Sequence, residues 1–325
     1  MLLPFGANCL MNSAATPDHP FLRRDAHSLG IDDAQVRRWL RHGEIRRVFR
    51  GVYVPSRLED TLELRAACAG LVLPPHCVFV ERSAAWLHGI DLHAPDERFT
   101  VPELEVVSFR HKNAVRRAGI YGATRDLTSR DVTHRGNVGL TTPLRTALDL
   151  ACLRGEPPAL AALDAFMRAF AITHEDLERE LPRYRRRRGV VQLRRLIPMA
   201  SPLAESPGES WLRATLLAHG FPNPDLQIEF WDDGRLVARA DLGYRHLRIA
   251  VEYFGEEFHG PDDEEHDMAR IRWLEERRWH VVVVRKDGFA GPARDAWMNE
   301  LAREIARRSR PRGKRRYPRG QPFTV

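Results

Sequence analysis

The residues RLVARAD (235–241), LGYRH (242–246) and LRIAVEYFG (247–255) decide the fold class of the C-terminal part of the chain. The first and last runs are rich in Val, Ile and Leu, and each predicts a short β-strand. Each strand ends in a carboxylate, Asp241 or Glu252, and adjacent strands would bring the two within reach of one divalent cation. Mg²⁺ needs few carboxylates plus substrate phosphate, so the pair predicts a Mg²⁺ (or Mn²⁺) site for phosphodiester hydrolysis.

The segments around these strands extend the pattern into an α/β domain over residues 203–309. DDG (232–234) is a tight-turn signal between two strands. WHVVVV (279–284) is apolar without alternation, so it predicts a strand buried on both faces. The predicted order is helix, three strands, helix, strand and helix, over residues 207–219, 226–231, 235–241, 247–253, 264–277, 279–285 and 292–308.

Arginine dominates the charge of this chain. The formal net charge is +7, and only three of the 51 basic residues are lysines. A guanidinium group binds phosphate through a planar fork and stacks on bases, so the excess favours DNA as a partner. A GC-rich genome, which encodes Arg and Ala readily, is the alternative explanation, but it does not place arginines in clusters.

Cysteine usage and hydropathy exclude several classes of protein. The four cysteines show no C-x-x-C spacing, which argues against a zinc ribbon and against a disulfide framework. No apolar run approaches the ~20 residues of a membrane span, and the first residues lack the basic segment of a signal peptide. We therefore expect a cytoplasmic protein that does not associate with membranes.

Residues 19–56 predict a winged helix-turn-helix. HPFLRRDAHSLG (19–30) and IDDAQVRRWLRHG (31–43) each predict a helix ending at glycine, and EIRRVFRGVYV (44–54) predicts a β-ribbon. The arginines of the second helix and of the ribbon have the placement of a recognition helix and a wing on DNA. A solvated basic face is the alternative. These arginines are Arg37, Arg38, Arg41, Arg46, Arg47 and Arg50.

A mixed α+β domain is predicted over residues 57–197, and a basic disordered tail over 310–325. TTPLRTALDLACLR (141–154) predicts a helix that begins at Pro143. RYRRRR (183–188) predicts a solvated helix end, which beside DNA would hold phosphates. The whole chain is thus expected to be an α/β multidomain protein.

The C-terminal domain resembles the restriction-endonuclease-like PD-(D/E)xK superfamily, with its α-β-β-β-α-β core. The ordered residues resemble more closely the very-short-patch-repair-like branch of that superfamily, over about 80 residues. No single element is specific for this branch, but the elements taken together in this order are fairly strong evidence for the resemblance. These elements are Glu209 in ESWLR, Gln227 in LQIEF, Asp241 in ADLGY, Glu252 in VEYFG, His259, Asp267 and Arg270 in DMAR, and Arg285 in WHVVVVR.

The resemblance implies a role for each of these residues. Asp241 and Glu252, with Glu209, would hold the metal, which lowers the pKa of a bound water. His259 or Arg270 would steady the scissile phosphate or the leaving oxygen. The residues left in supporting or phosphate-binding roles are Gln227, Asp267, Arg270 and Arg285.

Purely structural roles stay open for the same residues. Glu209 follows Ser206 by three residues, which is also the spacing of a capping box. Asp241 has the alternative role of a turn former, and His259 that of a surface or packing residue. Glu252 lies in an apolar strand, where a buried carboxylate needs a metal or an arginine partner. Asp267 and Arg270 are also spaced to pair with each other on a helix.

Phe254 departs from the pattern of the superfamily. It stands two residues after the second acid, where the superfamily has Lys and this branch commonly Asp. An apolar ring neither polarises a water nor binds a metal, so this position puts activity in doubt. Lys286 or His259 would have to supply the function from another segment.

The N-terminal half resembles the AbiEi-type antitoxins of abortive-infection systems, which act in phage defence. The phrases that carry the resemblance are GEIRRVFRGVYV (43–54), SAAWLHGI (83–90) and TTPLRTALDLAC (141–152), in this order within residues 20–180. The resemblance implies DNA binding by the first unit, autorepression of transcription, and a toxin protein opposed by the middle domain.

Three functions follow from these patterns. The first is a Mg²⁺-dependent DNA endonuclease guided by its winged helix. The second is an antitoxin or autorepressor whose nuclease-like domain is degenerate and only holds DNA or a partner. The third is a scaffold whose carboxylates pair with arginines. Phe254 favours the second, and the retained Asp241, Glu252 and Gln227 favour the first.

Overall fold

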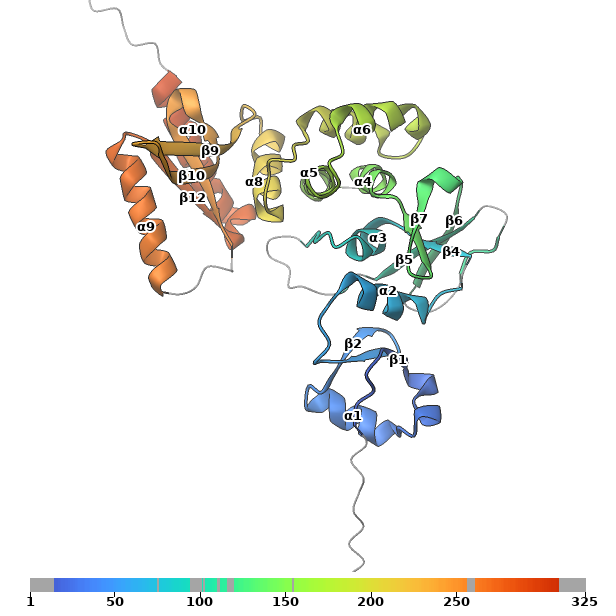
Figure 1. Cartoon of the computed structure of the whole chain (residues 1–325). Coiled ribbons are helices and arrows are strands. Elements are labelled where there is room, and N and C mark those ends of the chain that lie inside the picture. Colours follow the sequence, from blue (N-terminus) through green and yellow to red (C-terminus); the bar gives the residue numbers. More distant parts are fainter. Residues whose placement is uncertain are drawn as a thin grey trace, which may run out of the picture. The chain divides into compact units, whose positions relative to one another are not determined.

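The chain divides into two compact units, one ending at Ala200 and the other beginning at Ser201 (Figure 1). The computed structural model describes residues 15–74, 76–93, 101, 103–109, 112–115, 120–153, 155–255 and 261–309, without the side chains of residues 261–267. The predicted tail over 310–325 lies outside these residues. Across the described ranges, no helix combines the length and the apolar character that crossing a membrane requires.

The first elements of unit 1 are one helix and a three-stranded antiparallel sheet of order β1-β3-β2. Asp32 caps the helix by accepting a hydrogen bond from the Gln35 N–H at 2.7 Å, and the Gln35 side chain accepts from the Asp32 N–H. Val36 and Trp39 are the buried residues of this helix. The elements are β1 (Phe21–Leu22), α1 (Asp33–Arg41), β2 (Ile45–Phe49) and β3 (Val52–Pro55).

The predicted helix over residues 19–30 is wrong. After β1 the chain makes two short 3-10 turns, η1 (Arg23–Asp25) and η2 (His27–Leu29). Phe21 and Leu22 pair with β3 as a strand, so too few residues remain for an α-helix. The first helix of the expected helix-turn-helix is therefore replaced by these turns, whereas α1 and the β2–β3 hairpin form as predicted.

The middle part of unit 1 is a mixed five-stranded sheet of order β6-β5-β4-β8-β7 with helices beside it (Figure 1). Its main core also takes in apolar residues of β2 and β3. The predicted helix after residue 141 is confirmed: Thr142 caps it and Pro143 begins it. The elements are α2 (Leu62–Gly70), β4 (Cys77–Phe79), α3 (Glu81–Leu87), β5 (Leu104–Phe109), β6 (Ile120–Arg125), η3 (Ser129–Asp131), β7 (Val132–Arg135), β8 (Val138–Thr141), α4 (Pro143–Ala151), α5 (Glu156–Phe170), α6 (His174–Glu180), η4 (Leu181–Tyr184), α7 (Val190–Leu196) and η5 (Ile197–Met199).

A buried carboxylate, Asp149 on α4, joins four segments of unit 1. Its Oδ1 accepts hydrogen bonds from Arg145 Nε at 2.9 Å and from Tyr184 OH at 2.6 Å. The same oxygen lies 2.8 Å from Arg187 Nη1, and Oδ2 accepts from Arg125 Nη1 at 2.8 Å. Burial of an ion is costly unless its partners replace water, and here three guanidinium groups and one phenol do so.

A second buried carboxylate, Asp131, extends this network. Arg183 Nη2 lies 2.7 Å from Asp131 Oδ2, and Arg145 Nη1 lies 3.4 Å from Oδ1. Burial opposes ionisation of Asp131, but the Arg183 guanidinium and the donors of Thr128 outweigh burial and hold its pKa well below the usual range. The predicted solvated helix end is exposed at Arg183, Arg185, Arg186 and Arg188. Arg183 and Arg187 in addition pair with buried aspartates, which the sequence did not predict.

Unit 2 contains the element order that the sequence predicts. Its four-stranded sheet has the order β12-β11-β10-β9, with β9, β10 and β11 antiparallel and β12 parallel to β11. The predicted tight turn is confirmed, since Asp233 and Gly234 both have positive φ between β9 and β10. The elements are α8 (Pro207–Ala218), β9 (Asp225–Asp232), β10 (Arg235–Tyr244), η6 (Arg245–Leu247), β11 (Ile249–Phe254), α9 (Pro261–Glu276), β12 (His280–Arg285), η7 (Lys286–Phe289) and α10 (Gly291–Ser309).

Helices cover both faces of this sheet (Figure 1). One core cluster joins Leu212 of α8 and Leu301 of α10 to the sheet, and another joins Leu274 of α9 to it. The prediction of complete burial for the last strand is wrong, because β12 is an edge strand: Val282 and Val284 are buried, but Val281 and Val283 are only half-buried. The central strand β11 has the continuous burial expected of β12.

Gly243 lets β10 and β11 approach closely. A Cβ atom at this position would lie 2.2 Å from the Ile249 carbonyl oxygen, so we expect Gly243→Ala to destabilise unit 2 by about 1–3 kcal/mol through overpacking. Urea unfolding followed by tryptophan fluorescence measures this, because Trp211, Trp231, Trp273, Trp279 and Trp297 all lie in unit 2.

Gly255→Ala is the matched control for that experiment. A Cβ atom at Gly255 would make ordinary contacts at 3.4 Å and beyond, so this variant should unfold like the wild type. Equal midpoints for the two variants would contradict the close approach of β10 to β11.

Candidate functional site

The six arginines predicted to bind DNA lie on α1, on β2 and at the turn that follows β2. Arg37, Arg41, Arg47 and Arg50 are exposed, and Arg38 and Arg46 are half-buried. In contrast to Arg23, which pairs with Asp33 at 3.0 Å, none of the six forms an ion pair with any residue that the structure describes. Their charges are therefore available to an external anion.

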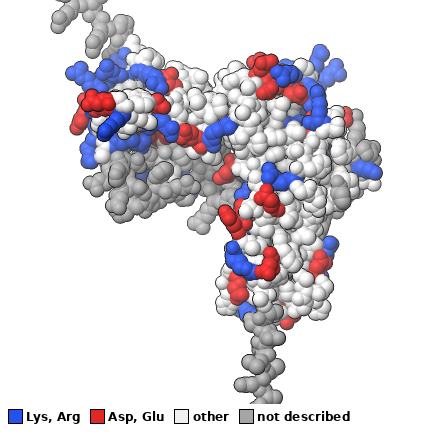
Figure 2. All heavy atoms as spheres, in the orientation of Figure 1, with Lys and Arg blue, Asp and Glu red and all other residues white. Residues whose placement is uncertain are grey.

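The face of unit 1 that Figure 2 shows carries basic and acidic side chains mixed together. Ion pairs such as Arg57 with Asp18 and Arg65 with Asp60 also occur in unit 1. A surface of mixed sign attracts a polyanion weakly. The six arginines, which form no ion pair within the described ranges, are therefore the part of this surface that we expect to attract a polyanion.

Two predicted site residues of unit 2, Gln227 and Asp241, come from neighbouring strands and lie where both strands are irregular. Leu226 and Leu242 pack with α8 and α10, whereas Ile228 and Ala240 pack with α9. In a regular strand, residues two positions apart lie on the same face of the sheet. Leu226 and Ile228 in β9 lie on opposite faces, and so do Ala240 and Leu242 in β10, so each strand is irregular at the residue between its pair. The residue between them is Gln227 in β9 and Asp241 in β10.

Positive φ at Gln227, +47°, accompanies this change of face. Such a backbone conformation is unusual for a residue with a side chain and is often found at functional sites. The β9–β10 pairing of Ile228 with Ala240 and of Leu226 with Leu242 places Gln227 beside Asp241. Asp241 is also next to β11, because its Oδ2 accepts a hydrogen bond from the Tyr253 N–H at 2.8 Å.

Glu209 of α8 joins this group. Its Oε2 accepts hydrogen bonds from Gln227 Nε2 at 2.8 Å and from the Glu205 N–H at 2.9 Å. Ser206 caps α8 by accepting from the Glu209 N–H, which is one half of the predicted capping box. The Glu209 carboxylate does not complete that box, because it accepts from Glu205 and Gln227 instead. Gly208 lets the start of α8 approach the Tyr253 ring closely, since a Cβ atom at this position would lie 2.0 Å from that ring.

Glu252 lies in the same strand as Tyr253 but has a basic neighbour. Its side chain is 2% exposed, and its Oε2 lies 3.2 Å from Nη1 of Arg270 on α9. The same Arg270 nitrogen donates to the Arg239 carbonyl at 3.1 Å. An arginine partner is one of the two ways in which a buried carboxylate at this position was expected to be neutralised.

The acidic groups of this site resist ionisation. Burial, together with the charge of Asp241, raises the pKa of Glu209 to about 7. Burial also raises the pKa of Asp241, although the Tyr253 N–H and Arg270 partly offset it. Two such carboxylates are stabilised by sharing a proton or by a cation, and this chemistry fits a divalent metal held by Glu209 and Asp241.

Glu252 fits a metal less well, because Arg270 already neutralises it. Within the described ranges, no group of three or more His, Cys, Asp or Glu side chains has the arrangement of a metal site. Binding of Mg²⁺ or Mn²⁺ to the Glu209–Asp241 pair therefore remains a prediction.

The other predicted residues are dispersed or lie outside the described residues. Arg285 ends β12 and is exposed, and it is the register partner of Phe254, which is half-buried at the end of β11. Asp267 belongs to α9, but its side chain is outside the described part of the chain, and His259 lies outside it entirely.

Sequence reasoning missed three contributors. Glu205 and the backbone of Tyr253 complete the hydrogen bonds of the two acids, and the first lies in the PMASPLAESPGES segment that has the composition of a linker. The third is the cluster around Asp149, whose only signal was an Arg-x-x-x-Asp spacing inside a helix, at Arg145.

The raised pKa of Glu209 predicts a pH-dependent stability. Because the folded-state pKa is above the ordinary value of 4.5, the folded state binds more protons between about pH 4.5 and 7 and loses stability as the pH rises through this range. We expect Glu209→Gln to gain about 2 kcal/mol relative to wild type between pH 5 and pH 8. Urea unfolding at a series of pH values measures this gain.

Glu275→Gln is the control, because Glu275 is an exposed residue of α9 that does not contact Glu209 in the described structure. The free energy of unfolding of this variant should depend on pH in the same way as that of the wild type. Parallel profiles for Glu209→Gln and wild type would show that the Glu209 carboxyl has an ordinary pKa.

Comparisons with known proteins identify the family of the chain. Residues 18–56 match the family model described as a transcriptional regulator, AbiEi antitoxin, and residues 76–199 match that of the AbiEi antitoxin C-terminal domain. The predicted antitoxin resemblance of the N-terminal half is therefore confirmed.

Two proteins of Mycobacterium tuberculosis are similar over most of the chain. They are the uncharacterized protein MT2308 of strain CDC 1551 / Oshkosh and the uncharacterized protein Rv2248 of strain ATCC 25618 / H37Rv. Each is 30% identical over 283 residues, which is 85% of this chain and 94% of the relative. The similarity therefore spans both units. The chain belongs to one family with these mycobacterial proteins, and its unit 1 carries AbiEi antitoxin domains.

Proposed function

We propose that this protein is a DNA-binding regulator of the antitoxin type, with DNA and a toxin protein as its partners. The observation that carries the proposal is the set of six arginines on α1 and the β2–β3 hairpin, which form no ion pair with any described residue. Arginines that no carboxylate neutralises can release counterions from DNA phosphates, and this release supplies most of non-specific affinity.

We assign two parts of unit 1 to DNA binding. The exposed face of α1, with Arg37 and Arg41, is the proposed recognition helix, and the hairpin with Arg47 and Arg50 is the proposed wing. A helix fits the major groove, and a hairpin fits beside it on the phosphate backbone. The match of residues 18–56 to a transcriptional regulator supports this assignment.

A second candidate function is a Mg²⁺-dependent endonuclease in unit 2. The observation in its favour is the pair of buried acids, Glu209 and Asp241, beside the irregular backbone of Gln227. When bound there, a divalent cation would activate a water for attack on a DNA phosphodiester. These two side chains would hold it, and Gln227 would orient Glu209 through their hydrogen bond.

Two features weigh against cleavage. Arg270 neutralises Glu252, and Phe254 offers a hydrocarbon ring where related enzymes have a polar group. We therefore favour an antitoxin-type regulator whose unit 2 holds DNA or a partner through a nuclease-like domain of restriction-endonuclease type.

Replacing exposed arginines of α1 should reduce the salt dependence of DNA binding. For Arg37→Gln combined with Arg41→Gln, the slope of log Kobs against log salt should fall in magnitude by about 2, since each lost phosphate contact contributes about 0.9. Fluorescence anisotropy of a labelled duplex across a series of KCl concentrations gives this slope.

The control removes two exposed arginines elsewhere in unit 1, through Arg186→Gln combined with Arg194→Gln. This variant has the same net charge as the α1 variant. If both lower the slope equally, the attraction comes from net charge and the proposed recognition helix is wrong.

Incubation of supercoiled plasmid with the wild-type protein separates the two candidate functions. With Mg²⁺, with Mn²⁺ and with chelator, we expect the plasmid to stay intact while binding persists, because Glu252 is tied to Arg270. Metal-dependent nicking that an Asp241→Ala variant loses would instead establish the endonuclease and assign its site.

A further inference from the structure

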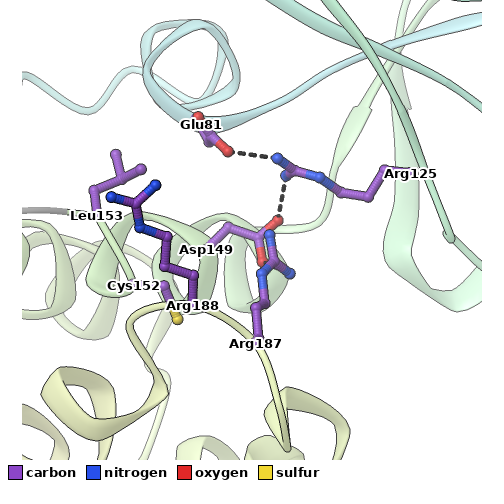
Figure 3. Close-up of a pocket in the computed structure, with 7 residues that line it drawn as sticks. All are labelled: Glu81, Arg125, Asp149, Cys152, Leu153, Arg187 and Arg188. Atoms are coloured by element: carbon purple, nitrogen blue, oxygen red, sulfur yellow. Dashed lines mark hydrogen bonds and ion pairs between the residues drawn. The ribbon is translucent and has the colours of Figure 1, made fainter.

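A cavity of about 650 Å³ opens on the middle part of unit 1, and none of the six arginines of α1 and the hairpin lines it (Figure 3). Its volume is in the range of sites that bind small molecules. Basic side chains dominate its polar lining: three arginines face two carboxylates. The lining residues are Glu81, Arg125, Asp149, Cys152, Leu153, Arg187 and Arg188.

The guanidinium groups of Arg125, Arg187 and Arg188 all point into this space (Figure 3). Arg125 is fixed by two carboxylates, since its Nη1 lies 2.8 Å from Asp149 and its Nη2 lies 2.6 Å from Glu81. Arg187 is fixed by Asp149 at 2.8 Å and by its position over the Tyr184 ring. Each group still has N–H donors beyond these contacts, and anchored donors lose little entropy when they bind an anion.

Arg188 differs from these two arginines. It is exposed and lines the cavity, yet it forms no ion pair with any other residue in the described ranges. The buried aspartates account for Arg125 and Arg187, but neither needs Arg188. A third guanidinium group at the cavity is therefore not explained by charge balance inside unit 1.

The backbone next to Arg188 is held in one position. Gly189 has φ +85°, and a Cβ atom there would lie 2.0 Å from the Cys152 carbonyl oxygen. The backbone that follows Arg187 and Arg188 thus packs closely against the C-terminal end of α4. Gln192 adds to this contact by donating to the Ala151 carbonyl at 2.9 Å.

A second cavity, of about 450 Å³, shares Arg125 and Arg187 with the first. It adds Arg145 and Arg183 to the basic lining, with Asp126 as its carboxylate. Basic groups thus continue from one cavity to the next, and the low dielectric of a recessed site strengthens their attraction for an anion.

We propose that the first cavity binds the phosphate group of a small molecule through Arg125, Arg187 and Arg188. The planar fork of each guanidinium group matches the oxygens of a phosphate, and three forks from different directions suit a terminal phosphate dianion. The volume left beside the phosphate would accept a group about as large as a nucleoside. This site is distinct from the DNA surface proposed for α1 and the hairpin.

Isothermal titration of the full-length protein with inorganic phosphate tests the proposal, with chloride holding the ionic strength constant. Saturable phosphate binding is expected, and Arg188→Gln should weaken it about tenfold or more, because it removes charge-assisted hydrogen bonds. The variant should keep the melting temperature of the wild type, since Arg188 is exposed and unpaired among the described residues.

Arg194→Gln is the matched control: it removes an exposed arginine of α7 that does not line the cavity, and it should bind phosphate like the wild type. Equal affinity of wild type and Arg188→Gln would overturn the proposal, as would the absence of phosphate binding above chloride.

Adenosine monophosphate and a short DNA duplex distinguish the sources of the phosphate. Tighter binding of the nucleotide than of phosphate, lost in Arg188→Gln, would assign a phosphorylated nucleoside, and equal binding would assign the phosphate group alone. An equal loss of duplex binding in Arg188→Gln would overturn the small-molecule proposal, because the arginine would then belong to the DNA surface.

Discussion

The carboxylate of Asp149 is the constraint on which unit 1 depends. It has no exposed side-chain surface, and its two oxygens are shared among three guanidinium groups and a phenol. Each donor comes from a different part of the sequence, so one buried charge fixes β6, α4, η4 and the loop before α7 relative to one another. Asp131 repeats the arrangement with Arg183 and Arg145. The arginines that compensate these two charges also form the walls of the cavities beside them.

Unit 2 also contains buried carboxylates, but their surroundings differ from those of Asp149 and Asp131. Its acids gather where β9 and β10 both change face. Among the residues that the structure describes, neither Glu209 nor Asp241 has an arginine as close as the one that Glu252 has. Their pKa values are raised, whereas that of Asp131 in unit 1 is lowered. Buried carboxylates thus stabilise the fold of unit 1, where arginines neutralise them, whereas in unit 2 ionisation of Glu209 and Asp241 is unfavourable. Carboxylates with raised pKa values are common at functional sites.

Local patterns in the sequence predicted most of the elements, and long-range pairing accounts for the errors. The turn at 232–234, the Pro143 start of α4 and the strand of Asp241 follow from neighbouring residues alone. The failed helix over 19–30 depends on pairing with β3, and the half-burial of β12 depends on its place at the edge of the sheet. An arginine partner for Glu252 was among the predicted alternatives, but its identity as Arg270 was not predicted. The Asp149 cluster was not predicted either, because its members are up to 62 positions apart.

The division between Ala200 and Ser201 has a consequence for the order in which the protein is made. The buried ion network closes within unit 1, so no later residue is needed to neutralise Asp149 or Asp131. Chains are synthesised at about 5–20 residues per second and domains fold as they emerge, so the 125 residues from Ser201 to Val325 take about 6–25 s more. Asp149 and Asp131 thus have their arginine partners before the residues of unit 2 are made, and we expect unit 1 to fold without them.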